Sequence, residues 1–391
     1  MRKITQKLQA FPETNECRRV VDNTASDAKS FGVMNNAAPC PRCEVLPELE
    51  HGPVVLHMWP PLGHTSGKIR SAAAKAGRLV DTGSGVSVAL GSDEIDGLLK
   101  DLSSDLTRGE LEDTHCLTRS GEDEPTFAEF AKVTTLARLS AMRGAKWLLQ
   151  VLNENALGTM FQPIVSRDAP HIPFAHECLL RWRRPDGTMG PPGALFEAAG
   201  DAGLLFHLDR AAREVHARNA AAQSVGTKLF LNFTPTSIYD PRNCLKSTLA
   251  VIDEVGLSRD QIVFEVIETE RVDDVDHLKN ILSYYQENGF QVALDDLGAG
   301  HATLQMLGQL RPDLVKLDMD LVRDVHADRF KGELVRRIIE LAHEFDIQVV
   351  AEGIEYAEEA AWLTSQKVDF MQGYYFAKPD TSPYTVIDRR G

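Results

Sequence analysis

Short apolar runs that carry a polar side chain at or near their end recur through the second half of the chain. Seven such runs contain Glu177, Asn232, Glu265, the pair Asp295 and Asp296, Lys316, Glu352 and Gln372. After the first interval they follow one another every 20 to 36 residues, which fits one strand, one helix and two short loops. With the run FQPIV ahead of them they make eight predicted strands. This alternation over about 220 residues predicts a closed (β/α)8 barrel around a buried parallel sheet.

The first part of the chain has a different pattern. Residues 1–36 show no apolar periodicity, and we expect an irregular or disordered amino terminus. Residues 37–120 predict a small α/β domain with a regulatory or sensory role. Its expected strands are PVVLHMW and VSVAL, and its expected helices are 66–77 and 92–104, the second capped by Ser92.

A charged, turn-rich segment at 118–126 indicates a domain boundary. Residues 121–157 are expected to form a helical connector, and residues 158–385 the barrel. Within the connector, apolar residues recur every three positions: Phe127, Phe130, Val133, Leu136, Leu139 and Met142. Such a stripe is typical of helix packing, here in a connector or a dimer helix.

Charge and composition narrow the class of protein. A net charge of −15 argues against a surface that binds a nucleic-acid polymer, although a small anion could still bind beside divalent metal. The amino terminus lacks the apolar stretch of a secretory signal, and no apolar run reaches the length of a membrane span. The six cysteines form no compact framework. These features favour a reduced, cytoplasmic protein without membrane contact.

The polar residues at the strand ends predict a metal site. The active-site mouth of such a barrel is built at the carboxyl ends of the strands, and carboxylates that meet there repel one another without cations. Mg²⁺ and Mn²⁺ favour oxygen ligands, and two ions about 3.5–4 Å apart would clamp a phosphodiester, with Asp295 as the natural bridge. Asp295 and Asp296 can share this site only where the backbone turns, as Gly298 and Gly300 suggest. Lys316 could hold and polarise the attacking water.

Eight motifs between Phe161 and Pro379 occur in a fixed order: FQPIV, HECLLRW, LNFTPTS, FEVIETE, VALDDLGAG, VKLD, VVAEGIE and MQGYYFAKP. Together they resemble the EAL domain, the family of bacterial cyclic di-GMP phosphodiesterases. The signature tripeptide reads Glu177-Cys178-Leu179 here, with cysteine in place of alanine. The resemblance implies hydrolysis of cyclic di-GMP to linear pGpG with two Mg²⁺ or Mn²⁺ ions per site.

The resemblance also implies a role for each matched residue. One metal would be held by Glu177, Asn232, Glu265 and Asp295, and the second by Asp295, Asp296 and Glu352. The expected catalytic residues are Lys316, Glu352, Glu177 and Glu268, where Lys316 acts on the water and Glu268 holds the loop after the fifth strand. The expected substrate contacts are Gln162, Arg181 and Gln372.

That loop departs from the family pattern. Where the family usually has DDFGTGYSSL, this chain has DDLGAGHATL, so an aromatic ring, a hydroxyl and a tyrosine are lost. In the family this loop couples dimerisation to the second metal site, which implies a homodimer through the barrel and a modest, regulated rate. The alternative is a catalytically weak or silent barrel that binds cyclic di-GMP as a receptor and signals through a protein partner. Another partner could bind the amino-terminal domain.

Two cysteines in the amino-terminal region, Cys40 and Cys43, have the spacing of half a zinc site. The other half could come from a set of scattered residues: His51, His57, His64, His115 and Cys116. Because no second pair completes the pattern, plain reduced thiols are the competing interpretation. Cys178, beside Glu177 in a predicted strand, is expected to pack rather than to act as a redox switch.

Overall fold

The computed structural model describes residues 45–47, 49, 52–80, 85–123, 125–238, 240–266, 275–298 and 304–388. The chain divides into two compact units, Met1–Cys40 and Pro41–Gly391, and every described residue lies in the second. The amino terminus predicted to be irregular lies outside the described residues. So do Cys40, Cys43 and Glu268.

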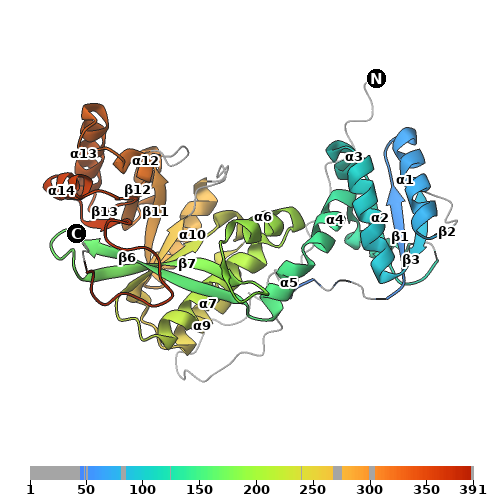
Figure 1. The fold of residues 1–391 in the computed structure, drawn as a ribbon, viewed down its shortest axis with the longest axis horizontal. Coiled ribbons are helices and arrows are strands. Elements are labelled where there is room, and N and C mark those ends of the chain that lie inside the picture. The colour runs from blue at the N-terminus through green and yellow to red at the C-terminus, as the bar shows by residue number, and fades with distance from the viewer. Residues whose placement is uncertain are drawn as a thin grey trace, which may run out of the picture. The chain divides into compact units, whose positions relative to one another are not determined.

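The small α/β region predicted near the amino terminus contains a five-stranded sheet. Its strands are β1 (Val54–Trp59), β2 (Arg78–Val80), β3 (Val86–Leu90), β4 (His115–Arg119) and β5 (Thr134–Thr135). Their order is β2-β3-β1-β4-β5, and every neighbouring pair is antiparallel (Figure 1). Helices α1 (Gly63–Ala76) and α2 (Ser92–Asp105) share a core with β1 and β3, and α3 (Arg108–Asp113) precedes β4. The first four strands with α1 and α2 form a split βαβ arrangement.

The start of α2 corrects one prediction. Its N-cap is Gly91, and Ser92 is the first helical residue. The Glu94 carboxylate, three residues after Gly91, accepts a hydrogen bond of 2.6 Å from the Gly91 backbone N–H. Because this side chain reaches back to the helix start, no Ser92 side-chain cap is needed.

The connector contains η1 (Phe127–Lys132), α4 (Leu136–Gly144) and α5 (Lys146–Asn153). Leu136 and Leu139 are buried in the core around β1, as the apolar stripe predicts. Phe127 and Phe130, however, are 92% and 59% exposed, so these two residues of the stripe are not buried by the described part of the chain. The reason is a change of helix type, because a 3₁₀ turn over residues 127–132 does not continue the face of the α-helix that follows.

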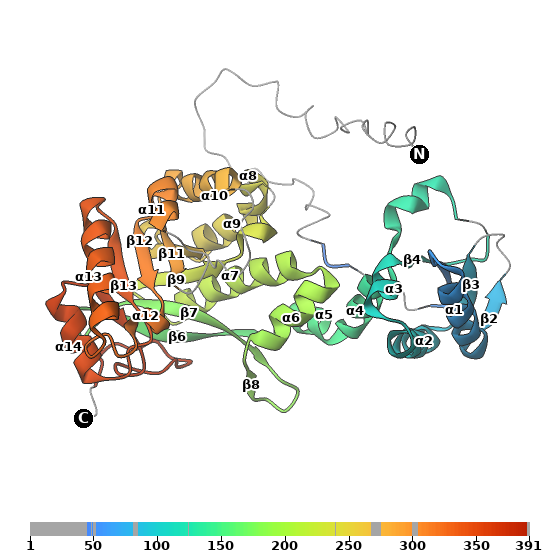
Figure 2. The ribbon, with the colours of Figure 1, turned by 90° about the horizontal axis from the view of Figure 1, so that it is seen from above.

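The predicted barrel is confirmed as a closed eight-stranded sheet with outer helices (Figures 1 and 2). Its strands are β6 (Leu157–Ser166), β7 (Pro173–Arg183), β9 (Lys228–Phe233), β10 (Ile262–Val266), β11 (Gln291–Leu297), β12 (Leu314–Leu317), β13 (Gln348–Ala351) and β14 (Phe370–Gln372). Closure comes from β6, which pairs with both β14 and β7. The two-residue strand β8 (Met189–Gly190) forms a hairpin with β7 outside the barrel.

The helices of the barrel follow in chain order. They are α6 (Gly193–Ala202), α7 (Leu205–Ala222), α8 (Pro241–Cys244), α9 (Lys246–Glu254), α10 (Val275–Glu287), α11 (Leu304–Leu310), α12 (Met319–Val322), α13 (Arg329–Glu344) and α14 (Ala357–Ser365). Short 3₁₀ turns, η2 (Pro235–Ser237) and η3 (Arg259–Gln261), precede α8 and β10. Within the described segments, no helix combines the length and the apolar character needed to cross a membrane.

One strand breaks the expected parallel order. The seven strands from β7 to β14 in the barrel are parallel, but β6 is antiparallel to both of its neighbours. Residues 167–172 join β6 to β7 without a helix. A connection this short gives an antiparallel hairpin, because a parallel pair needs a crossover of a dozen or more residues.

Candidate active site

The barrel interior is built in layers, and the candidate site is one of them. A buried apolar layer takes one residue from each of the eight strands: Ile164, Ala175, Phe230, Val263, Ala293, Leu314, Val350 and Phe370. Two positions further towards the carboxyl ends of the parallel strands lie Glu177, Asn232, Glu265, Asp295, Lys316, Glu352 and Gln372. On β6 the corresponding residue is Gln162, two positions before Ile164 because that strand runs the other way. Alternation along each strand therefore directs all eight polar residues to one layer at the mouth.

Lys316 lies at the centre of this polar layer. Its Nζ is 2.6 Å from Glu265 Oε1, 2.5 Å from Glu352 Oε1 and 3.2 Å from Asp295 Oδ1. Glu177 Oε2 is further away, at 4.0 Å. The Lys316 side chain is only 1% exposed. One buried ammonium group thus faces four carboxylates that come from four strands.

Burial and mutual repulsion shift the pKa values of these groups. Burial raises the pKa of Glu265 well above its ordinary value. The charge of Lys316 acts to lower this pKa, whereas the neighbouring carboxylates raise it further. Burial likewise raises the pKa of Glu352 to about 8. Burial alone would lower the pKa of Lys316, but the surrounding carboxylates raise it well above its ordinary value. Lys316 is therefore cationic at neutral pH, where Glu265 and Glu352 bind protons more readily than ordinary glutamates.

Asp296 joins this layer through an unusual backbone conformation. Its φ is +55°, and the pairing of β11 with β12 shifts register between Leu294 and Leu297. This irregularity brings a carboxylate oxygen from each of Asp295, Asp296 and Glu352 within 4.8 Å of one another. Burial first, and the charge of Asp295 second, raise the pKa of Asp296 to about 6. The predicted turn after Asp295 is thus present, and its left-handed residue, Asp296, lies two positions before Gly298.

Glu177 is held by two amides. Asn232 Nδ2 donates a hydrogen bond of 3.3 Å to Glu177 Oε1, and Gln372 Nε2 donates one of 2.6 Å to Glu177 Oε2. In the described part of the chain, the buried Gln372 Oε1 and Glu265 Oε2 make no hydrogen bond. Buried oxygens without a donor are suited to hold a cation.

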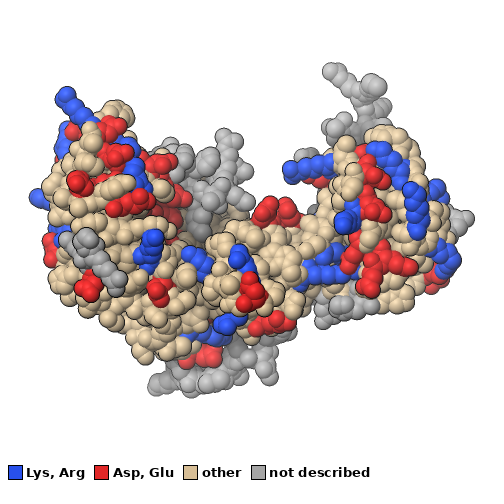
Figure 3. Space-filling model, viewed as in Figure 1, with Lys and Arg blue, Asp and Glu red and all other residues tan. Residues whose placement is uncertain are grey.

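A cleft of about 340 Å³ opens over this layer. Among the predicted residues, Gln162, Glu177, Asp296, Glu352 and Gln372 line it. Its other side chains were not predicted, and they are Asp318, Met319, Glu355 and Tyr374. Asp318 and Tyr374 each lie two positions beyond a predicted residue, so the same alternation could have identified them. Acidic side chains gather over the part of the barrel that carries α12, α13 and α14 (Figure 3).

Other predicted residues lie elsewhere. Arg181 follows Glu177 by four positions on β7, and its Nη1 donates to the Leu180 carbonyl oxygen at 2.7 Å rather than to a carboxylate. Cys178 is fully buried in the outer core, and burial raises the pKa of its thiol. Among the His, Cys, Asp and Glu side chains in the described part of the chain, Asp295, Asp296 and Glu352 are the one group of three or more whose ligand atoms lie within 4.8 Å of one another. His57, His64, His115 and Cys116 therefore form no such set there.

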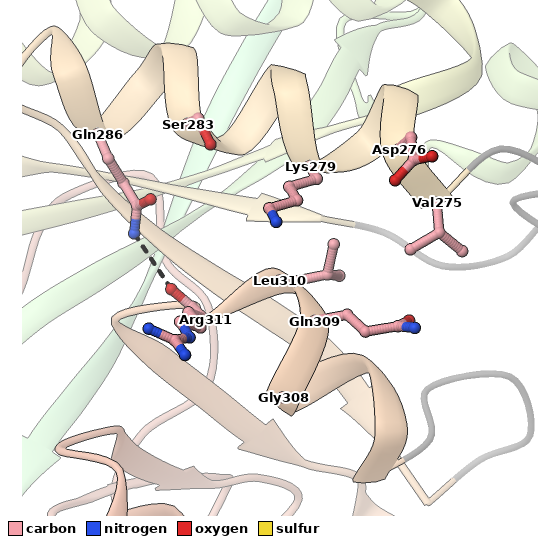
Figure 4. Close-up of a pocket in the computed structure, with 9 residues that line it drawn as sticks. All are labelled: Val275, Asp276, Lys279, Ser283, Gln286, Gly308, Gln309, Leu310 and Arg311. Atoms are coloured by element: carbon pink, nitrogen blue, oxygen red, sulfur yellow. Dashed lines mark hydrogen bonds between the residues drawn. The ribbon is translucent and has the colours of Figure 1, made fainter.

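A larger hollow, of about 810 Å³, lies between α10 and α11 (Figure 4). Its lining includes Lys279, Gln286 and Arg311, and Gln286 Nε2 donates to the Arg311 carbonyl oxygen at 3.3 Å. None of the predicted site residues lines it. Volume alone therefore does not identify the site, whereas the converging carboxylates at the mouth do.

Two curated relatives from Escherichia coli (strain K12) are similar in sequence. The probable cyclic di-GMP phosphodiesterase PdeG is 31% identical over 245 residues, which cover 60% of this chain and 46% of PdeG. The cyclic di-GMP phosphodiesterase PdeR is 30% identical over 206 residues, which cover 52% of this chain and 31% of PdeR. The chain thus matches less than half the length of either relative.

A solved structure of a standalone versatile EAL protein from Vibrio cholerae O395, in its c-di-GMP bound form, is similar in fold. Its TM-score is 0.54 at 34% identity, over 59% of this chain and 95% of that one. The family model described as "EAL domain" matches residues 145–379, and no family model matches the amino-terminal region. Since this match covers more than half of the chain and the whole barrel mouth, the chain belongs to the EAL-domain family.

Proposed function

We propose that this protein hydrolyses cyclic di-GMP to linear pGpG at the barrel mouth, with two divalent cations. The observation that carries the proposal is the ring of buried carboxylates around Lys316. A structural core would not gather so many like charges, because each costs free energy to bury and repels its neighbours. Such an arrangement is expected in a site where bound cations offset the carboxylates and hold a phosphodiester.

The donor set fits hard divalent cations. Glu177, Asn232, Glu265 and Asp295 would hold one, and Asp295, Asp296 and Glu352 the other. Glu265 Oε2, which has no hydrogen-bond partner among the described residues, and the close oxygens of Asp295, Asp296 and Glu352 support this division. When bound, Mg²⁺ or Mn²⁺ would supply positive charge that offsets the carboxylates and the phosphodiester and favours ionised water.

Lys316 and Glu352 would have different roles towards the attacking water. Because the pKa of Lys316 is raised, its ammonium group donates hydrogen bonds and holds the water oxygen, and it does not serve as a base. Glu352, whose Oε1 lies 2.5 Å from Lys316 Nζ, is placed to accept the proton of the same water. The water oxygen then attacks one phosphorus as its proton passes to Glu352, the bond to the 3′-oxygen breaks, that oxygen takes up a proton to become a hydroxyl group, and the product is linear pGpG.

Substrate contacts are proposed for Gln162, Arg181 and Gln372. Gln162 and Gln372 line the cleft, and Arg181 lies on β7 beyond Glu177 with a guanidinium group suited to a phosphate. The names of the relatives and the cyclic di-GMP in the 34% identical structure support the choice of substrate. We also propose a homodimer through the barrel, with residues 37–120 as a regulatory domain joined by residues 121–157 and Glu268 holding the loop after the fifth strand.

The test is direct. Purified protein is incubated with cyclic di-GMP and either Mg²⁺ or Mn²⁺, and pGpG is quantified by chromatography. The matched control is Glu177→Ala, which removes a proposed ligand at the mouth. Release of pGpG by the wild type alone is the expected result. Tight binding without turnover at any metal concentration would instead identify a cyclic di-GMP receptor. The described residues of the proposed ligand set give no support to that alternative.

A further inference from the structure

A buried ion pair lies outside the carboxylate ring, on α7. Asp209 and Arg213 are one helical turn apart, 4% and 0% exposed, and Asp209 Oδ2 pairs with Arg213 Nη1. Arg213 Nε also donates to Thr248 Oγ1 at 3.3 Å, whereas its Nη2 has no hydrogen-bond partner in the described part of the chain. A buried pair of this kind contributes little to stability compared with apolar side chains of similar volume. The role of the Asp209–Arg213 pair therefore lies in the neighbouring backbone that Asp209 contacts.

The other oxygen of Asp209 holds the end of a barrel strand. Asp209 Oδ1 accepts a hydrogen bond of 2.9 Å from the Thr234 backbone N–H. Pairing of β9 with β10 ends at Phe233, so the Thr234 N–H lies beyond the strand ladder. The Thr234 side chain also hydrogen-bonds Asp209. The β9 strand thus ends on a buried carboxylate that Arg213 holds in place.

This contact lies two residues from a proposed metal ligand. Asn232 belongs to the polar layer, pairs in register with Glu265 and donates to Glu177 Oε1. Alternation turns the Phe233 side chain into the outer core, while the Thr234 N–H meets α7. The backbone from Asn232 to Thr234 is thereby fixed on both sides of the barrel wall.

We propose that Asp209 is a positioning residue for Asn232, and that Arg213 holds Asp209 in the orientation this requires. The chain of contacts runs from Arg213 through Asp209 and Thr234 to the end of β9. Without it the fold persists, but the Asn232 amide loses its fixed place in the first metal site. This inference rests on the proposed function, since it assigns Asn232 to a metal.

The test replaces the pair and measures metal binding directly. The double variant Asp209→Leu with Arg213→Met substitutes apolar side chains of similar volume and leaves no unpaired buried charge. Mn²⁺ binding to the full chain is measured by calorimetry without substrate. At least tenfold weaker binding at one of two sites is expected, with unchanged circular dichroism. Turnover should be low at limiting Mn²⁺ and return to within about threefold of wild type at saturation, because the chemistry itself is intact.

A second variant covers the case in which the double variant does not fold. Thr234→Pro removes the backbone N–H and the hydroxyl that meet Asp209, and it also shifts the Thr234 φ from −100° towards the value of about −65° that proline requires. The same weakened Mn²⁺ binding is expected. The matched control is Asp240→Ala, which removes another carboxylate that accepts a backbone N–H, that of Arg242, at the start of α8 and shortly after β9 in the sequence. It should bind Mn²⁺ like the wild type.

The outcomes distinguish a failure of the Asp209 positioning role from a failure of the proposed function. Wild-type affinity at both sites in a folded double variant or in Thr234→Pro overturns the role of Asp209 and leaves the proposed function standing. Absence of Mn²⁺ binding by the wild type overturns both. An equal loss of affinity in Asp240→Ala also overturns the positioning role, because it would show that any loosened carboxylate near β9 has the same effect.

Discussion

Lys316 Nζ lies 2.5 Å from Glu352 Oε1, and both groups lie in the same polar layer of the barrel. The same nitrogen contacts Glu265 and Asp295, so one cation serves several carboxylates at once. A single buried charge cannot offset all of them, and the raised pKa of Glu352 reflects that deficit after the larger effect of burial. The layer is therefore organised to receive additional positive charge.

Lys316→Met should lower turnover at least about 100-fold, because it removes the donor that holds the attacking water and keeps the buried stem. Mn²⁺ stoichiometry, measured by calorimetry, should be unchanged, since Lys316 acts on the water rather than on the ions. Lys279→Met, at the separate hollow between α10 and α11, is the control and should retain wild-type turnover. Loss of Mn²⁺ binding in Lys316→Met would contradict this assignment.

Glu352→Gln should lower the rate far more than it lowers affinity for cyclic di-GMP. The side chain is assigned to the proton transfer and to the second cation, whereas the contacts with guanine and phosphate remain. Calorimetry with substrate should show affinity within a few-fold of wild type while pGpG release falls to background. A parallel fall of affinity and rate would show that Glu352 binds substrate instead.

Removal of divalent cations should both stop turnover and destabilise the fold. Cations that bind only the native state add about 2.7 kcal/mol at 100 times their dissociation constant. The thermal midpoint should therefore rise with Mn²⁺ and fall when a chelator is added. Asp295→Asn, which alters the shared ligand, should lose most of that rise. A midpoint that is independent of Mn²⁺ in the wild type would exclude the two-cation site.

Acid should destabilise the barrel through His216. Burial first, and the charge of Arg181 second, lower its pKa to about 3, and its Nδ1 contacts Thr159 Oγ1 at 2.7 Å. The unfolded chain binds this proton near pH 6.5, so the stabilising contribution is complete above pH 6.5 and is lost as the pH falls towards 3. At pH 5 the loss is about 2 kcal/mol from this group. Urea unfolding at pH 6.5 and at pH 5 measures how much the free energy of unfolding falls between the two. That fall should be smaller for His216→Gln than for the wild type, and unchanged for the exposed control His326→Gln.

The loop after β11 should respond to partial restoration. Ala299→Thr with His301→Tyr, two positions outside the described residues, restores the hydroxyl and the tyrosine of the family pattern. Turnover should rise by up to about tenfold with unchanged metal stoichiometry, because the restored hydroxyl and ring would favour the catalytically competent state of the site. An unchanged rate would show that the loop is not limiting.

Leu297→Phe is expected to act differently from these two changes. Leu297 is 2% exposed and packs in the outer core of the barrel, so a larger ring should cost about 1–3 kcal/mol of stability. Addition of this change to the restored loop should lower the urea midpoint. A midpoint equal to that of the loop variant would show that the core adapts to the ring.

The polar layer was predictable because its geometry follows from alternation along each strand. Once a run such as QVALDD is assigned to a barrel strand, Asp295 must share the interior face with Ala293. Repeated strand by strand, that rule collects the carboxylates, Lys316 and Gln372 at one mouth without knowledge of any distance. Gln162 on the first strand was assigned from the family resemblance instead, and the direction of that strand was predicted wrongly.

The tertiary structure decided the strand direction, the backbone conformation and the long-range contacts that no local sequence pattern specifies. The antiparallel direction of β6 follows from a short connection, and the left-handed backbone of Asp296 depends on how β11 pairs with β12. The role of Asp209 depends on the packing of α7 against the end of β9, where its carboxylate accepts a hydrogen bond from the Thr234 backbone N–H. The sequence by itself determined which residues face the barrel interior, because side-chain direction is set by the neighbouring residues. Contacts between distant segments were decided only when the barrel closed, since they depend on how separate elements pack.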